Sequence, residues 1–355
     1  MPALIGPSPY IYVGTRLRVR KAKLIPRDEY LRMLNMGLPE ITRVIQETTY
    51  KREIDELSTA FSGIDLIEVA LSWNLAKEYQ NVLKIMPGSL QQLTQSYLHR
   101  WDIQNVLTIL RGKDQGISAG SIKEVLIPAG ELDRAFLDRL LAEDSPAKIV
   151  ELLKGWRLYP VLSREFKQAA ETGWFSHLEN ELYKQFYADI IADARSGIKG
   201  GAAFLDYIHL EIDIRNLQNL FRVRAQQEQG DVREFLIPGG TFTIDELSRL
   251  NGIEDLDDFI DAIEKRVTNK PLVAVLEDLR KEGSLKQHSL QENEIALTRV
   301  KLAQMERMSK LHPFSIWPIL AYLELKKYEV TNLRAITRGK ESRLPPERIR
   351  SYLVM

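Results

Sequence analysis

The sequence predicts an all-α protein made of three structurally similar helical domains. The first observation is a signature segment that occurs three times, as WDIQNVLTILRGK at Trp101–Lys113, IDIRNLQNLFRVR at Ile212–Arg224 and YEVTNLRAITRGK at Tyr328–Lys340. The second is the spacing, because the signature asparagines lie 111 and 116 residues apart, which is the period of a domain. The third is the helical spacing of apolar residues within the segments. Together these features predict an internal triplication.

Each signature segment carries an acid, an asparagine three residues later and an arginine six residues after that. The nine residues are Asp102, Asn105, Arg111, Asp213, Asn216, Arg222, Glu329, Asn332 and Arg338. On a helix the acid and the asparagine lie about 60° apart, and the arginine lies about 180° from the acid. The three side chains therefore cannot pair with one another, and buried polar groups need partners. We interpret the set as a structural signature that ties each helix to two different neighbours.

Each domain is expected to contain two long helices, the second carrying the signature. The expected ranges are 64–86 and 88–112, 175–195 and 201–226, and 289–311 and 314–339. Helix-breaking residues separate the members of each pair, namely Pro87-Gly88, the glycines at 197, 200 and 201, and His312-Pro313. The apolar residues expected to form buried stripes are those at 103, 106, 107 and 110, and at 214, 217, 220 and 221.

A second recurring motif, LIP, suggests the domain boundaries 1–117, 118–229 and 230–355. It occurs at 24–26, 126–128 and 236–238. IKEVLIP (122–128) and VREFLIP (232–238) also align with IRSYLVM (349–355), so we expect the sequence to end where a fourth unit would start. Short helices with amino-terminal signals are predicted after each LIP, at Pro39, at Ser145-Pro146 and at Asp255.

The composition excludes several classes of protein. Of the residues, 44% are hydrophobic and 28% charged, as expected of a soluble globular chain. A formal net charge of zero argues against a nucleic-acid binder. The chain has no cysteine, which excludes disulfides and thiolate chemistry. No signal peptide or membrane span is expected, since the longest apolar stretch, Pro313–Leu323, is about half a span and contains two prolines.

No motif indicates catalysis, a cofactor or a metal ion. The glycines at 197–201 and 239–240 lack the Lys-Ser/Thr of a phosphate loop. The histidines at 99, 177, 209, 288 and 312 are dispersed, without ligand spacing. The acidic run at 254–258 lacks the spacing of a calcium loop and is interpreted as the start of a helix. We therefore expect no catalytic, cofactor-binding or metal-binding residues and no small-molecule substrate.

A basic stretch near the amino terminus is the one strongly charged feature. Its cations are Arg16, Arg18, Arg20, Lys21 and Lys23. One interpretation is a solvated face, or one paired with nearby carboxylates. The other is a contact with an acidic protein surface or with anionic lipid headgroups. The sequence leaves both open.

The chain resembles the C subunits of archaeal and bacterial A/V-type ATP synthases, which correspond to the d subunits of vacuolar ATPases. The resemblance is carried by the three signature segments, by EVLIPAGELD (124–133) and EFLIPGGTFT (234–243), by YVGTRLRVRKAKLIP near the start, and by HPFSIWPILAYLELKKYEVTNLRAITRG (312–339). It spans essentially the whole chain, and its specificity lies in the order and spacing of these segments.

The resemblance implies a non-catalytic rotor subunit of the central stalk. It implies three helical domains with pseudo-threefold symmetry around a funnel-like cavity, one face receiving the central shaft and the opposite face seated on the membrane proteolipid ring. The protein would be a monomer within the complex, peripheral to the cytoplasmic face of the cell membrane. It would transmit torque during proton- or sodium-driven ATP synthesis or ATP-driven ion pumping. The resemblance itself assigns no contact residues; from its charge, the basic stretch is a candidate contact with acidic loops of the ring or with lipid headgroups.

Two other functions remain possible from the residues alone. A helical scaffold or adaptor would share the fold and bind another protein in its cavity. An enzyme with carboxylate acid–base chemistry would need one cleft with a perturbed acid pair, whereas this sequence predicts three equivalent polar clusters. On physical grounds alone we expect the partner surfaces of the rotor subunit near the helix breaks and the short helices after LIP, marked by exposed apolar residues.

Overall fold

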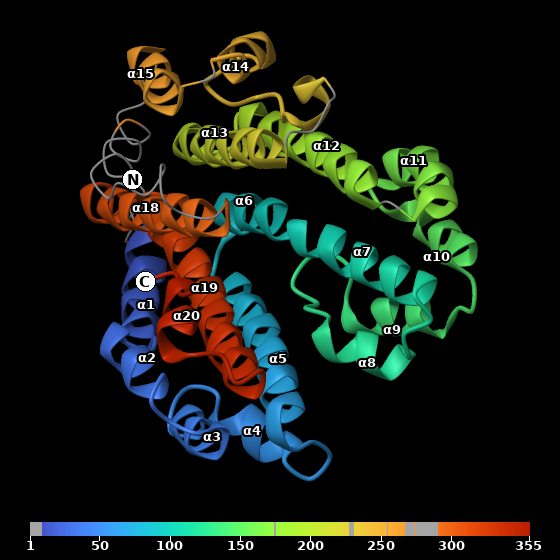
Figure 1. Ribbon diagram of the computed structural model, residues 1–355, viewed down its shortest axis with the longest axis vertical. Coiled ribbons are helices and arrows are strands. Elements are labelled where there is room, and N and C mark those ends of the chain that lie inside the picture. Colours follow the sequence, from blue (N-terminus) through green and yellow to red (C-terminus); the bar gives the residue numbers. More distant parts are fainter. Residues whose placement is uncertain (1–8, 174, 227–230, 254, 267–272, 274–289) are drawn as a thin grey trace, which may run out of the picture. The chain divides into compact units, whose positions relative to one another are not determined.

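Helices account for all the regular structure of the described residues. The computed structural model describes residues 9–173, 175–226, 231–253, 255–266, 273 and 290–355, and every element there is an α- or 3-10 helix (Figure 1). The all-α prediction is therefore confirmed. Residues 50–198 form one compact unit, which we call the middle unit. The described residues up to 49 and those from 199 onward form a second, the terminal unit.

The middle unit is organised around α5, α7 and α12. Helix α7 packs against α8, α9, α10 and α12, while α5 packs against α4 and α8, and α11 against α12. The elements are α4 (Lys51–Leu57), α5 (Gly63–Lys84), α6 (Gly88–Leu98), α7 (Arg100–Asp114), α8 (Ala119–Val125), α9 (Arg134–Ala142), α10 (Pro146–Leu152), η1 (Leu153–Gly155), α11 (Tyr159–Thr172) and α12 (Phe175–Arg195).

The terminal unit is organised around α19. This helix packs against α18, α13 and α20, and also against α1, α2 and α3 from the beginning of the chain (Figure 1). The elements are α1 (Pro9–Lys21), α2 (Arg27–Met33), α3 (Leu38–Gln46), α13 (Gly201–Gln226), η2 (Val232–Phe235), α14 (Ile244–Asn251), α15 (Leu256–Arg266), α18 (Leu290–Leu311), α19 (Trp317–Glu341) and α20 (Pro346–Ser351).

The helix breaks lie where the sequence predicts them. Helix α6 begins at Gly88, whose φ of 53° lies in the left-handed region, where a glycine is favoured. Helices α12 and α13 have the predicted bounds, and α18 ends one residue before His312. One difference is that the helix expected at 88–112 is divided into α6 and α7. The amide of Asp102 donates to the carbonyl of His99, 3.0 Å away, in a tight i to i+3 turn that interrupts the α-helical pattern.

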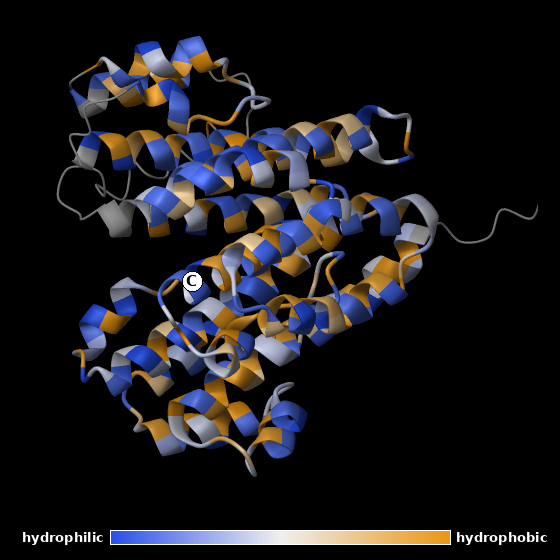
Figure 2. Cartoon of the chain, turned by 90° about the vertical axis from the view of Figure 1, so that its right-hand side faces the viewer, coloured by the Kyte–Doolittle hydropathy of each residue, from blue (hydrophilic) through white to orange (hydrophobic). Residues whose placement is uncertain are grey.

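Hydrophobic and hydrophilic residues alternate along the helices (Figure 2). The predicted stripe residues Ile103, Val106, Leu107 and Leu110 are all buried. The stripe residues of the second signature segment are buried as well, namely Ile214, Leu217, Leu220 and Phe221. Burial of these stripes supplies the apolar stabilisation that holds the signature helices in place.

The amino-terminal signals after the LIP motifs also begin helices. Pro39 lies in the first turn of α3, and Pro146 in the first turn of α10. Asp255 precedes α15, and its Oδ1 accepts from the amide of Asp258, 3.0 Å away. The acidic run thus includes a helix cap, as expected, although its first residue, Glu254, lies outside the described residues. The boundaries at 117/118 and 229/230, the triplication and the pseudo-threefold arrangement stay predictions.

Candidate functional site

Each signature asparagine forms two hydrogen bonds with the backbone of a single residue. Its Nδ2 donates to that residue's carbonyl, and its Oδ1 accepts from the same residue's amide. The pairs are Asn105 with Ile127 (2.7 and 2.9 Å), Asn216 with Ile237 (2.8 Å for both) and Asn332 with Val354 (2.8 Å for both). All three asparagines are buried. A carboxamide used in this way holds an extended segment as a neighbouring strand would.

These bonds confirm one sequence alignment and correct another. Ile127, Ile237 and Val354 occupy the same place in IKEVLIP, VREFLIP and IRSYLVM, so that alignment is confirmed. The first LIP motif has a different role, because the amide of Ile25 donates to Glu329 Oε2, at 2.7 Å. In the other two signature segments the acid binds residues that follow LIP. The motif at 24–26 is therefore not the counterpart of the two later ones. Its sequence is identical to theirs, but its position relative to the acid of the signature segment is different.

The two signature aspartates cap a loop with their carboxylates. Asp102 accepts from the amides of Glu131 and Leu132, at 2.8 and 3.0 Å. Asp213 accepts from the amide of Thr241 at 2.8 Å and from the Thr241 hydroxyl. Both carboxylates are buried, and no ion pair to either is found in the described part of the chain. They are stabilised by hydrogen-bond donors rather than by a cation.

Two glycines make this close approach possible. A Cβ on Gly130 would overlap the Asp102 carboxylate, and one on Gly240 would overlap that of Asp213. Any larger residue would push the loop off the acid. Sequence reasoning did not single these glycines out, although the alignment of EVLIPAGELD with EFLIPGGTFT places them at the same position and could have identified them.

The third acid is held differently. Glu329 Oε1 accepts from Lys326 Nζ at 2.7 Å, while Oε2 accepts from the amide of Ile25. Lys326 and Glu329 are only 2% and 3% exposed, so this is a buried ion pair. The Lys340 ammonium also donates to the carbonyl of Leu34. The third signature segment is thus bound both to the last residues of the chain, through Asn332, and to residues near its beginning.

Burial strongly raises the pKa values of the two signature aspartates. Desolvation raises the pKa of Asp102 to about 7, even though the amides of Glu131 and Leu132 favour the charged form. Desolvation likewise raises the pKa of Asp213 to about 6, against hydrogen bonds from Thr241 and Phe242. A perturbed acid can mark a catalytic group. Here each acid is already occupied by backbone donors, so the arrangement fits a structural cap.

The signature arginines reach a different neighbour. Arg111 pairs with Glu179 on α12, and Arg222 pairs with Glu294 on α18, both at 2.7 Å. These pairs are half-exposed, in contrast to the buried acids and asparagines. The prediction that each copy connects its helix to two neighbours is confirmed for these two segments. Arg338 lines a groove of about 560 Å³ together with Glu294, Tyr328 and Tyr352.

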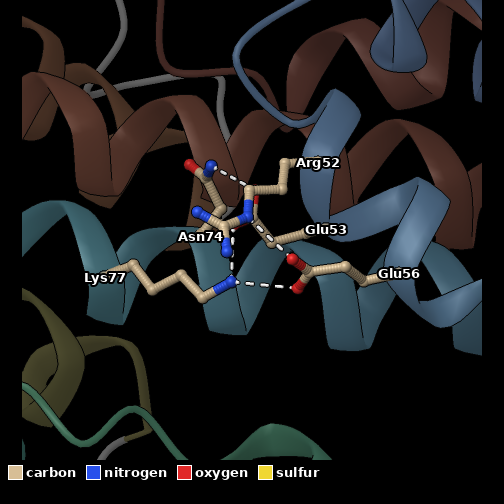
Figure 3. Close-up of polar contacts among 5 residues, drawn as sticks. All are labelled: Arg52, Glu53, Glu56, Asn74 and Lys77. Carbon is tan, nitrogen blue, oxygen red and sulfur yellow. Dashed lines mark hydrogen bonds and ion pairs between the residues drawn. The ribbon is translucent and has the colours of Figure 1, made fainter.

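A further polar cluster was not predicted from the sequence. Buried Glu53 on α4 accepts from Asn74 Nδ2 at 2.8 Å and from Lys77 Nζ at 3.0 Å, both on α5 (Figure 3). Glu56 extends it through Lys77 at 3.3 Å and Arg52 at 2.7 Å. The α5 partners lie more than twenty residues from Glu53 and Glu56 and lack a repeated pattern, so nothing in the sequence indicated the contact. The cluster fixes α4 onto α5.

The basic stretch forms α1 and the turn that follows it. Arg16, Arg18 and Lys23 are exposed, whereas Arg20 and Lys21 are half-buried. Lys21 pairs with Glu306 on α18. The stretch is therefore partly bound to a nearby carboxylate and partly open to solvent. Both observations fit the first interpretation of the sequence, while a contact with an acidic protein surface or with anionic lipid headgroups stays a prediction.

Exposed apolar residues gather around the same helix. Eight large apolar side chains are exposed in the described part of the chain, and five of them lie on α1 or at the α18–α19 turn. These five are Ile11, Tyr12, Val19, Leu311 and Phe314, with exposures between 44% and 63%. We call them, with Arg16 and Arg18, the basic–apolar face. Apolar groups exposed together in this way are typical of a docking surface.

The described residues hold neither a cluster of metal-binding side chains nor a membrane-spanning helix. No group of three or more His, Asp or Glu side chains among them could hold a metal ion. None of the helices in the described ranges is long and apolar enough to cross a membrane.

Comparisons with known proteins agree with the resemblance noted in the sequence. The family model described as ATP synthase (C/AC39) subunit matches residues 13–352. The A-type ATP synthase C protein of Methanosarcina mazei is 37% identical over 354 residues, which cover 99% of this chain and 94% of that protein. The corresponding A-type ATP synthase proteins of Archaeoglobus fulgidus and Haloferax volcanii are 34% and 33% identical, covering 98% and 97% of this chain and 96% and 97% of their own lengths. With a match over nearly its whole length, the chain belongs to the ATP synthase (C/AC39) subunit family.

Proposed function

We propose that this chain is a non-catalytic rotor subunit of the central stalk, coupling the membrane proteolipid ring to the central shaft. The observation that carries the proposal is the end-to-end match to the C subunits of A-type ATP synthases. The protein would sit peripherally at the cytoplasmic face of the membrane, as one copy per complex. It would transmit torque during ion-driven ATP synthesis or ATP-driven ion pumping, without a cofactor or small-molecule substrate of its own.

The anchors of the signature segments support this role physically. A torque-transmitting part must resist shear, so its helices need fixed positions rather than mere apolar contact. Buried two-point hydrogen bonds at Asn105, Asn216 and Asn332 supply such fixation. Removing one would leave a buried amide and carbonyl without partners, which makes sliding of the segment costly.

The same pattern supports three similar domains around a funnel-like cavity. The asparagine bonds recur with one geometry at three places, and the acids bind a backbone amide each time. In the proposed arrangement one face of the funnel receives the shaft and the opposite face meets the ring. The basic stretch, with Arg16, Arg18, Arg20, Lys21 and Lys23, is proposed to contact the ring or the lipid beside it.

The deciding experiment is purification of the native complex through an affinity tag on this chain, followed by identification of every protein in it. Shaft and proteolipid proteins should co-purify in fixed proportion with a single copy of this chain. A helical scaffold or adaptor would instead bring down other proteins without the ring. Cross-linking within the purified complex would then assign the two faces.

The enzymatic alternative has its own test. The isolated chain should hydrolyse no ATP, because Asp102 and Asp213 are each occupied by backbone amides. ATP hydrolysis that disappears in the Asp102→Asn variant would contradict the proposed function. Hydrolysis that persists in that variant would indicate a contaminating ATPase.

A further inference from the structure

The basic–apolar face occupies one side of α1. At about 100° per residue, its exposed residues span an arc of about 160°. Tyr12, Arg16 and Val19 form one edge of the arc, and Ile11 and Arg18 the other. The opposite side, with Val13 and Leu17, is buried. Since α1 is already packed against its own unit, the exposed arc is a second apolar side that the fold itself does not cover.

The α18–α19 turn extends this surface. The carbonyl of Pro313 lies 3.7 Å from the position a Cβ on Gly14 would take, so the turn abuts α1 directly. Leu311 and Phe314 flank that contact in sequence and are 60% and 63% exposed. The pairing of Lys21 with Glu306 fixes α1 along α18 as well. The turn and the helix therefore present their apolar groups from one rigid body.

The charges on this surface are of a single sign. The first 27 residues include six cations and no acid. No ion pair is found for Arg16 or Arg18 in the described ranges, whereas Lys21 is engaged by Glu306. The Arg16 guanidinium lies 5.7 Å from the centre of the Tyr12 ring. On α1 the two outward arginines thus lie at the two borders of the exposed arc, with the apolar and aromatic groups between them.

We propose that the basic–apolar face lies on a membrane surface rich in anionic lipid headgroups. The inference rests on the proposed function, which brings the chain to the membrane. The face carries apolar and aromatic groups between two arginines, and the first 27 residues include no acid that an anionic surface would repel. That mixture fits a bilayer interface, where aromatic and aliphatic groups enter the acyl boundary while arginines reach the phosphates.

The expected affinity follows from the charge. Each arginine near an anionic surface strengthens binding by roughly fivefold at moderate salt, so losing two should weaken it about 25-fold. Screening shortens the range of the attraction, and raised salt should reduce binding further. The apolar groups add a contribution that salt does not remove.

The test is co-sedimentation of the purified chain with vesicles of phosphatidylcholine containing one third phosphatidylglycerol, against pure phosphatidylcholine. The chain should bind the anionic vesicles and not the neutral ones. Arg16→Ser/Arg18→Ser should bind about 25-fold more weakly, and Tyr12→Ser/Phe314→Ser should lose the salt-resistant part. The matched control is Arg52→Ser/Arg164→Ser, which removes two exposed arginines elsewhere and should bind as the unaltered chain does.

Equal weakening in the control would show unspecific charge attraction and overturn the proposal. So would equal binding to both kinds of vesicle, or none to either while circular dichroism shows a folded chain. If vesicle binding is absent but ring and shaft proteins still co-purify, the lipid proposal fails and the proposed function stands. In that case an acidic protein surface is the partner of this face. If vesicles bind and the ring does not co-purify, the proposed function fails instead.

Discussion

The first two signature acids and the third each bind a backbone amide of another segment, but their charges are stabilised differently. Asp102 and Asp213 are buried against backbone amides with no cation beside them in the described residues, and burial raises their pKa values. Glu329 accepts one amide and also pairs with buried Lys326. The asparagine beside each acid makes the same two bonds in all three places. The asparagine therefore defines the shared geometry, while the partners of the acid differ with the segment that it binds.

The largest expected effect is from Glu329→Gln. It removes the anion that Lys326 pairs with inside the protein, and breaking a buried pair from one side costs about 4 kcal/mol. Asp102→Asn, the matched change without a cation, should cost only about 1 kcal/mol at pH 7. Urea denaturation followed by circular dichroism measures both. Similar losses would mean that the two kinds of anchor are not electrostatically different.

The next effect concerns pH. The pKa of Asp102 in the folded chain, about 7, lies above its ordinary value of 3.8, so the folded state holds a proton that the unfolded state releases. Its contribution to stability is therefore present in full below about pH 4 and is lost as the pH rises to about 7. The free energy of unfolding should fall by about 3 kcal/mol across that window, relative to Asp102→Asn. Parallel pH profiles for the two proteins would contradict the raised pKa.

A smaller effect should be alike in all three places. Asn105→Ala, Asn216→Ala and Asn332→Ala each leave a buried amide and carbonyl unpaired, which should cost about 2 kcal/mol. Gln104→Ala, at an exposed position of α7, serves as the control and should cost no more than about 0.5 kcal/mol. Thermal and urea unfolding of the set measure the losses. If Asn332→Ala left the free energy of unfolding unchanged while the other two substitutions lowered it, the third segment would not depend on its asparagine.

The smallest effect should come from the arginines. Arg111→Ala and Arg222→Ala break half-exposed ion pairs, each worth about 0.5 kcal/mol and screened by salt. The difference from the unaltered chain should vanish at high ionic strength. A loss that persists in high salt would indicate that these side chains contribute through packing rather than charge.

Much of this fold was predictable because it rests on local patterns. Apolar spacing and glycine or proline breaks predict α12 and α13 with their observed bounds, and the repeated spacing alone identifies the signature asparagines. What could not be predicted was the identity of partners far away in the chain. Lys326 lies three residues from Glu329, so their ion pair is local, but the second partner of Glu329 is the amide of Ile25, from the beginning of the chain. The prediction that the LIP motif at 24–26 is equivalent to the two later ones was wrong for the same reason, because the motif does not indicate which signature residue it contacts.

The attachment of Ile25 to Glu329 bears on the order of folding. Asn105 and Asp213 bind partners 22 and 28 residues ahead, so their loops can close soon after each segment is synthesised. The partner of the Ile25 amide, Glu329, lies 304 residues later in the chain. Closing so long a loop is entropically unfavourable, and contacts of this kind form late. We expect pulse-labelling hydrogen exchange to protect the amide of Ile25 after those of Ile127 and Ile237, which makes the beginning of the chain the last part to be secured.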